Sequence, residues 1–183
     1  MGLENIDTDS LVTAYVAASQ LLNPVGLPWA SQRPLIIAGG YIRDMYLEKT
    51  PKDIDVFTTA PMMDGYTYKL PNKGEEYDNI MGFEYVGDIT ISLPNLPLPV
   101  NFVHLSTDGM PLTTKNLIGG FDITMCQIGF DGDALEMTPA FMTDVRDKIM
   151  RVQNQTVGAN RHVQRMLEKF PDWKYIPYEA DTF

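Results

Sequence analysis

The spacing of apolar positions changes several times along the chain and predicts an alternation of short helices and strands. Near the N-terminus, apolar residues recur at helical spacing behind capping Asp and Thr residues, which predicts a helix over residues 9–22. The continuous apolar run Leu35–Ala38 predicts a buried strand, and the segment Asp53–Phe57 predicts a second one. Gly39-Gly40 ends the first strand and Pro51 turns the chain before the second, so only a brief helix fits between them.

The second half of the chain is interrupted more often by turn residues. Proline and glycine recur through residues 60–99 and leave room only for short strands around 83–92, so we interpret this segment as a variable insertion covering one side of a site. Val100–Leu105 predicts a strand, and Asp131-Gly132-Asp133 is typical of a hairpin turn. Apolar and basic residues separate onto two faces over residues 157–170, which predicts an amphipathic helix.

Because hairpins and helical crossovers alternate in this order, we predict an α/β (α+β) fold with a mixed, mostly antiparallel sheet of about five strands. Helices are expected to pack on one face of this sheet. The 183 residues contain no internal repeat or flexible linker, so we expect a single domain over residues 1–183.

Composition is that of an ordinary soluble globular protein, with 44% hydrophobic and 21% charged residues. No run approaches the roughly 18 apolar residues of a membrane span, and the acidic N-terminus does not resemble a signal peptide, so we expect a cytoplasmic protein without a membrane partner. The only cysteine, Cys126, is expected to be a small core residue. His104 and His162 have no metal-site or triad spacing and are expected to be hydrogen-bonded or exposed imidazoles.

The net charge of −10 argues against broad affinity for nucleic acid, because such affinity depends on neutralising phosphates. The charge is unevenly distributed. Residues 146–169 contain six Lys or Arg against two acids, Asp147 and Glu168, so a modest basic surface is expected in this stretch.

Asp53 and Asp55 are the clearest candidates for chemistry. Side chains at i and i+2 of a strand point to the same face, and two adjacent carboxylates favour either a shared divalent cation or an acid–base couple. Mg²⁺ suits such a pair, since it takes oxygen ligands and commonly completes its shell with substrate phosphates. Gly39-Gly40, between a strand and a helix, allows the backbone to approach a phosphate closely. Lys52 either contacts that phosphate or is a solvated strand-end lysine.

Two segments, Gly39–Asp44 and Pro51–Asp55, together resemble the signature of the DNA-polymerase-β nucleotidyltransferase superfamily, in its tRNA CCA-adding and bacterial poly(A) polymerase branch. The resemblance implies a nucleotidyltransferase head domain that binds an NTP with two Mg²⁺ ions. It implies that the ions are held by Asp53 and Asp55, that the triphosphate lies on Gly39 and Gly40, and that Arg43 and Asp44 belong to the nucleotide pocket.

A second block, Gly120–Cys126, is similar to the Arg-Arg-Asp-Phe-Thr-Ile-Asn block that lies beside the nucleotide sugar in this branch. Both arginines are replaced, the second by Phe121, while Asp122 and Thr124 are retained. The resemblance makes Thr124 a pocket residue and Asp122 either the third catalytic acid and metal ligand or a sugar contact. Asn101 occupies a natural place for a third carboxylate on a neighbouring strand, but an amide cannot accept a proton from a hydroxyl.

The acceptor is left open by the sequence. The resemblance covers the head domain over about two-thirds of the chain, continues into a neck-like helix at 157–170, and includes no motif of the base-reading and tRNA-binding domains. One hypothesis is a transferase acting on the 3′ end of tRNA or another RNA along the basic 146–169 stretch. Others are a minimal transferase that modifies a protein or small molecule, and a non-catalytic nucleotide-binding or inhibitory module.

Overall fold

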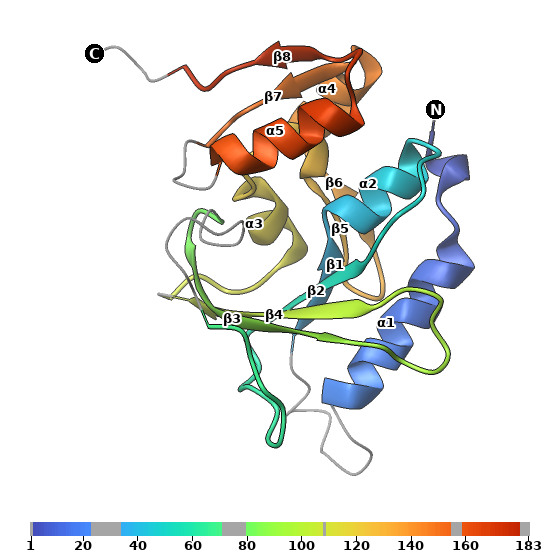
Figure 1. Cartoon of the computed structure of the whole chain (residues 1–183), viewed down its shortest axis with the longest axis vertical. Coiled ribbons are helices and arrows are strands. Elements are labelled where there is room, and N and C mark those ends of the chain that lie inside the picture. Colours follow the sequence, from blue (N-terminus) through green and yellow to red (C-terminus); the bar gives the residue numbers. More distant parts are fainter. Residues whose placement is uncertain (1, 23–33, 71–79, 108, 155–158, 180–183) are drawn as a thin grey trace.

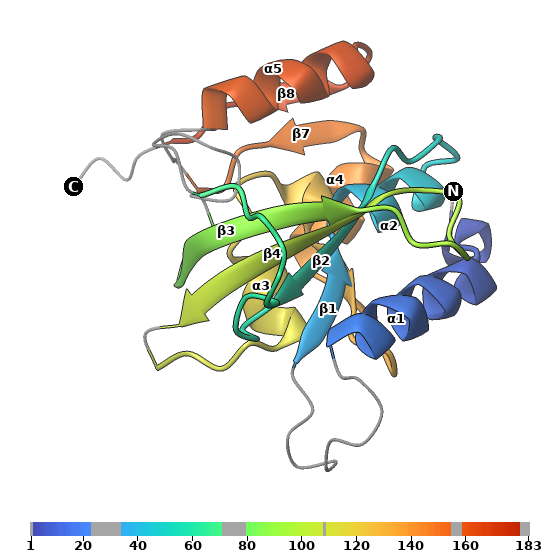
Figure 2. The ribbon, with the colours of Figure 1, turned by 60° about the horizontal axis from the view of Figure 1, so that its bottom comes forward.

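A six-stranded mixed sheet forms the centre of the molecule (Figure 2). The computed structural model describes residues 2–22, 34–70, 80–107, 109–154 and 159–179. The strands are β1 (Leu35–Ala38), β2 (Ile54–Thr58), β3 (Phe83–Ile91), β4 (Val100–Thr107), β5 (Ile128–Phe130) and β6 (Leu135–Met137), in the order β3-β4-β2-β1-β5-β6. Among the described strand pairs of this sheet, β2–β4 is parallel and the other four are antiparallel. The predicted mixed, mostly antiparallel sheet is therefore confirmed, with six strands in place of about five.

Helices cover both faces of the sheet, so the expectation that they pack on one face is wrong. The ring of Tyr15 in α1 (Thr8–Leu22) lies 5.7 Å from that of Phe130. The adjacent residue Gly129 faces the other way and packs against Thr114 and Ile118 of α3 (Thr114–Gly119). The physical reason lies in the central strands, because a continuous apolar strand such as β1 is buried on both sides and needs cover on each.

The C-terminal part of the chain adds a small layer above the end of the sheet (Figure 1). Its helices are α4 (Pro139–Arg146) and α5 (Ala159–Lys169), and β7 (Ile149–Arg151) pairs in parallel with β8 (Lys174–Ile176). The predicted helix over 157–170 is confirmed as α5, with Val163, Met166 and Phe170 buried as its apolar pattern requires. Residues 157 and 158 of that prediction lie outside the described residues.

The other predicted elements agree closely with the structure. The helix expected over 9–22 is α1, and the brief helix after the first strand is α2 (Gly40–Tyr46). The segment 60–99 contributes β3, which is an edge strand of the main sheet paired along its length with β4. Gly132 lies in the predicted hairpin turn between β5 and β6 with a φ of 98°. In the part of the chain that the structure describes, short 3-10 turns lie at Leu3–Asn5 and Thr124–Cys126. No helix within the described ranges is both long and apolar enough to cross a membrane.

Candidate active site

Strand register brings the two glycines and the two aspartates to one edge of the sheet. β1 and β2 run antiparallel with Ile37 opposite Val56, so the chain leaves β1 at Gly39 beside the point where β2 begins. Asp55 is the second residue of β2, and Asp53 immediately precedes that strand. Glycines and aspartates that are 13 to 16 positions apart in the sequence therefore come together through a single antiparallel strand pairing.

A pocket of about 640 Å³ opens at this edge, between the sheet and α5. Eight of the predicted site residues line it: Gly39, Gly40, Arg43, Asp44, Lys52, Asp53, Asp55 and Asp122. Two aromatic rings, Phe57 and Phe121, also line it and lie 5.6 Å apart, which gives one wall an apolar surface. Phe121 therefore places a ring where the family resemblance leads us to expect an arginine.

Gly39 adopts a conformation that only glycine takes readily, with φ 78° and ψ −126°. Its amide donates to the carbonyl of Ile128 at 2.9 Å, which ties the turn to β5. A side chain added here would lie 3.7 Å from the ring of Phe121, an ordinary contact, so the requirement for glycine comes from the backbone angles. The turn brings a bare backbone to the pocket beside Asp53 and Asp55.

Asp53 is exposed and Asp55 is half-buried, while Ile54 between them points into the core. The Nδ2 of Asn101 donates to Oδ1 of Asp55 at 3.2 Å, so the amide at the expected third-acid position contacts a carboxylate directly. Within the described ranges, no three His, Cys, Asp or Glu side chains are grouped so as to hold a metal ion by themselves. The donor set nevertheless fits Mg²⁺ bound to an NTP, because such an ion takes one or two carboxylates and completes its shell with phosphates and water.

Arg43 and Asp44 line the pocket, but their charges are already neutralised within the protein. The guanidinium of Arg43 lies 2.8 Å from Asp44, which also contacts the ammonium of Lys169 from α5. Arg43 further donates to the sulfur of Cys126 at 3.1 Å and lies over the ring of Phe170. This buried cluster joins α2 to α5 and forms the rear of the pocket.

Asp122 is buried and paired with a histidine that the sequence analysis did not assign to the site. The Nδ1 of His162 lies 3.0 Å from both carboxylate oxygens of Asp122. Burial alone would lower the pKa of His162, but hydrogen bonds to Asp122 and Cys126 outweigh it and raise that pKa well above its ordinary value. This pairing argues against the expected role of Asp122 as a metal ligand, because both oxygens face a cationic ring. We therefore restrict the candidate cation ligands to Asp53 and Asp55.

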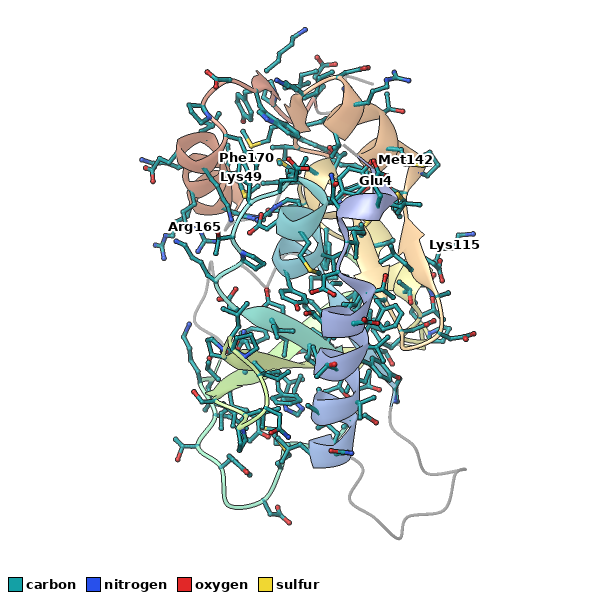
Figure 3. The ribbon with its side chains drawn as sticks, turned by 90° about the vertical axis from the view of Figure 1, so that its right-hand side faces the viewer. Glu4, Lys49, Lys115, Met142, Arg165 and Phe170 are labelled. Atoms are coloured by element: carbon teal, nitrogen blue, oxygen red, sulfur yellow. The ribbon has the colours of Figure 1, made fainter. Side chains whose placement is uncertain are left out.

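One signal in the sequence could have found His162. On α5 it is four residues before the inward-facing Met166 and seven before Lys169, so helical periodicity places all three on one side. This face of α5 lines the pocket. Arg165 and Glu168 are exposed and line the rim of the pocket. Figure 3 shows Arg165 extending from α5.

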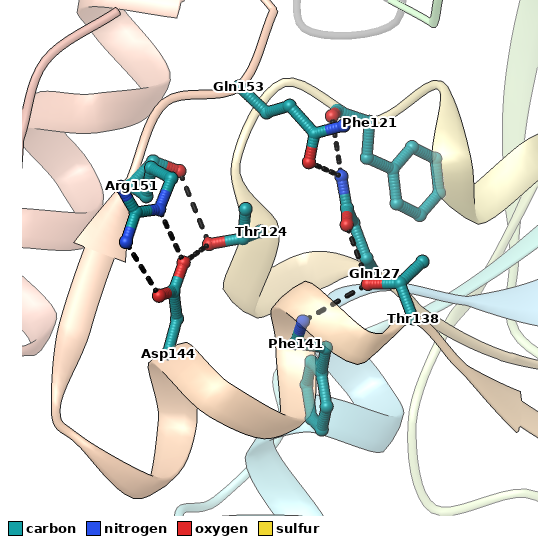
Figure 4. Close-up of polar contacts among 8 residues, drawn as sticks. All are labelled: Phe121, Thr124, Gln127, Thr138, Phe141, Asp144, Arg151 and Gln153. Carbon is teal, nitrogen blue, oxygen red and sulfur yellow. Dashed lines mark hydrogen bonds and ion pairs between the residues drawn. The ribbon is translucent and has the colours of Figure 1, made fainter.

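Thr124 does not line the pocket, contrary to the sequence prediction. Its hydroxyl is fully buried and donates to Asp144 at 2.7 Å, while Arg151 contacts the same carboxylate at 3.0 and 3.1 Å (Figure 4). Thr124 thus connects the segment beside the pocket to α4 and β7 through Asp144 and Arg151. Gln127 makes a similar connection nearby, since its amide hydrogen-bonds with the carbonyl of Phe121 and with the side chains of Gln153 and Thr138.

The sequence of this chain matches no family model and no curated protein. Its structure is similar to solved structures of CCA-adding enzymes. The TM-score is 0.55 at 17% identity against a CCA-adding enzyme with CTP, covering 95% of this chain and 42% of that one. It is 0.55 at 14% identity against the apo form II of a CCA-adding enzyme, covering 97% and 43%.

A third comparison is with the Thermotoga maritima CCA-adding enzyme complexed with tRNA(CCA), at a TM-score of 0.52 and 17% identity. It covers 97% of this chain and 41% of that enzyme's chain. The chain thus spans about two-fifths of the length of these enzymes. At these identities the likeness shows the fold alone, and this chain has the fold of the matched part of these CCA-adding enzymes.

Proposed function

We propose, on the premise that the chain has the nucleotidyltransferase fold, that it transfers a nucleoside monophosphate from an NTP to a hydroxyl group and releases pyrophosphate. The observation that carries this proposal is the meeting of Gly39-Gly40 with Asp53 and Asp55 in one pocket of about 640 Å³. Neither motif is specific alone. Their convergence at the edge of a sheet of this fold combines a bare backbone for phosphates with two oxygen ligands for a cation.

In this mechanism Asp53 and Asp55 would hold Mg²⁺, and two ions are expected. When bound, these ions would neutralise the negative charge of the triphosphate and activate the attacking oxygen. Gly39 and Gly40 allow the phosphates to lie against the main chain without a side chain in the way. Lys52, exposed at the rim just before the carboxylates, adds a positive charge on the phosphate side. Positioning and electrostatics of this kind supply most of the catalysis in phosphoryl transfer.

For the acceptor we propose an RNA 3′ end. Arg161 and Arg165 are exposed on α5, and Arg165 reaches the rim of the pocket, so an RNA backbone could approach along this helix. The described complexes of CCA-adding enzymes with CTP and tRNA(CCA) point to the same classes of ligand. One observation favours a protein or small-molecule acceptor instead, namely the net charge of −10.

The test is a transfer assay with each of the four α-labelled NTPs, Mg²⁺, and separate RNA, protein and metabolite fractions as acceptors. We expect label on RNA, and loss of transfer by orders of magnitude when Asp53 and Asp55 are both changed to Ala. The matched control changes two exposed aspartates outside the pocket, Asp64→Ala with Asp133→Ala, and removes the same net charge. Undiminished transfer by the Asp53/Asp55 variant would refute the assignment, and label on protein or metabolites would redirect the acceptor.

A further inference from the structure

Three polar side chains form a row across three neighbouring strands and end at one of the candidate metal ligands. In the parallel pairing of β2 and β4, Asp55 lies opposite Asn101, and in the antiparallel pairing of β4 and β3, Asn101 lies opposite Thr90. Side chains in register on adjacent strands project from the same face and lie close enough to interact. The row therefore follows from the backbone register.

Hydrogen bonds connect the row in one direction. The hydroxyl of Thr90 donates to Oδ1 of Asn101 at 3.2 Å, and Nδ2 of Asn101 donates to Oδ1 of Asp55 at 3.2 Å. An ionised carboxylate only accepts hydrogen bonds, so the Asn101 amide must turn its NH₂ group toward Asp55. Its oxygen then faces Thr90. The two contacts support each other in a single orientation of the amide.

Burial makes this orientation matter. Asn101 is 7% exposed, whereas Thr90 at the outer end is exposed and Asp55 at the inner end lines the pocket. A buried amide loses more from an unsatisfied group than an exposed one does, so Asn101 resists rotation. A neutral donor beside Asp55 also avoids the repulsion that a third carboxylate would cause before a cation arrives.

We propose that Asn101 is a positioning residue for Asp55 and that Thr90 fixes the orientation of the Asn101 amide. Together they fix the direction in which Asp55 presents its carboxylate to the divalent cation. This inference rests on the proposed function, because it assigns Asp55 to a cation bound with an NTP. Partners that orient a metal ligand in this way typically contribute about 10–100-fold to metal affinity.

The experiment measures Mn²⁺ binding by the loss of free EPR signal beyond that caused by the nucleotide alone, with each of the four α,β-methylene NTPs, which resist transfer. We expect Asn101→Ala to weaken Mn²⁺ binding by about tenfold and Thr90→Val by about threefold. In the Asn101→Ala background, Thr90→Val should have no further effect, because Thr90 acts only through the amide. Ser106→Ala and Thr107→Val, at the far end of β4, are the matched controls and should leave the affinity unchanged.

Each outcome decides between the two proposals. Unchanged Mn²⁺ affinity in Asn101→Ala would overturn the role of Asn101 alone, and an equal loss from Thr90→Val in both backgrounds would overturn the row. Failure of the unaltered protein to bind Mn²⁺ with any of the four analogues would overturn the proposed function as well. If Asn101→Ala did not fold, Thr90→Val at its exposed edge position would decide, and affinity equal to that of the unaltered protein would reject the inference.

Discussion

The imidazole of His162 and the carboxylate of Asp122 lie 3.0 Å apart, although 40 positions separate them in the sequence. The contact ties α5 to the pocket wall, and both partners are buried. Both carboxylate oxygens of the retained aspartate in the second sequence block therefore face the imidazole. The pair is a structural bridge with a charge that depends on pH.

The first prediction concerns that pH dependence. The folded-state pKa of His162 is raised well above its ordinary value, so its protonated form stabilises the fold. This stabilisation is fully present below the unfolded pKa of about 6.5 and is lost as the pH rises through the folded pKa. We expect His162→Gln to lower the free energy of unfolding most at acidic pH, with the difference from the unaltered protein shrinking as the pH rises above about 6.5.

Urea unfolding from pH 5.5 to pH 9.5 would measure this difference. Asp122→Asn should reproduce the same trend, and the double variant should lose little more than either single one, because both remove one interaction. A difference that stays constant over the whole pH range would contradict the assignment of the charged pair.

The second prediction compares two neighbouring glycines. Gly39→Ala forces a side chain onto φ 78°, which should cost about 1–3 kcal/mol of unfolding free energy. The backbone φ of Gly40 is not positive, and the Cβ that Gly40→Ala adds would lie 3.5 Å from Nη2 of Arg43, an ordinary contact. We therefore expect near-normal stability for this variant. Thermal melts of the two variants provide the measurement. Equal melting temperatures would show that the turn does not depend on the Gly39 conformation.

Local motifs in the sequence predicted the core of the pocket, because its residues come from one short β1–α2–β2 segment. The spacing of Gly39-Gly40 and Asp53-x-Asp55 sufficed to bring them together. Contacts across the chain were not predictable in this way. The pairing of Asp44 with Lys169 spans 125 positions and depends on where α5 packs, which no local pattern specifies.

Two errors have identifiable physical causes. Thr124 was assigned to the pocket through its place in a motif, yet its hydroxyl points away and satisfies the buried Asp144. Helices were expected on one face, although the continuous apolar run of β1 already indicated a strand covered on both. The place of Thr124 in a motif does not determine where its hydroxyl points, whereas the apolar run of β1 is visible in the sequence itself.

The third prediction tests the support behind the pocket wall. Arg151→Met leaves the carboxylate of Asp144, which is 2% exposed, without its cation. We expect the free energy of unfolding to fall by about 2 kcal/mol, less than for a fully buried pair, because the Arg151 side chain is 42% exposed. Arg146→Met makes the same change in an exposed pair with Asp147 and should alter stability little. Urea unfolding of both variants would check this, and equal effects would show that burial of Asp144 does not matter.

The last prediction separates a transferase from a non-catalytic nucleotide-binding module. Asp53 and Asp55 line the same pocket as Gly39 and Gly40, so in a transferase cation and nucleotide should bind jointly and stabilise the folded state by mass action. We expect CTP or ATP with Mg²⁺ to raise the melting temperature more than the sum of the shifts produced by each alone. Asp55→Asn should abolish the extra shift, since it removes an anionic ligand, while Asp133→Asn, exposed in the hairpin turn, should keep it. A shift with nucleotide alone that survives Asp55→Asn, together with no pyrophosphate release, would support the binding module and end the transferase proposal. That outcome would leave the fold assignment intact, because the fold does not depend on the charge of Asp55.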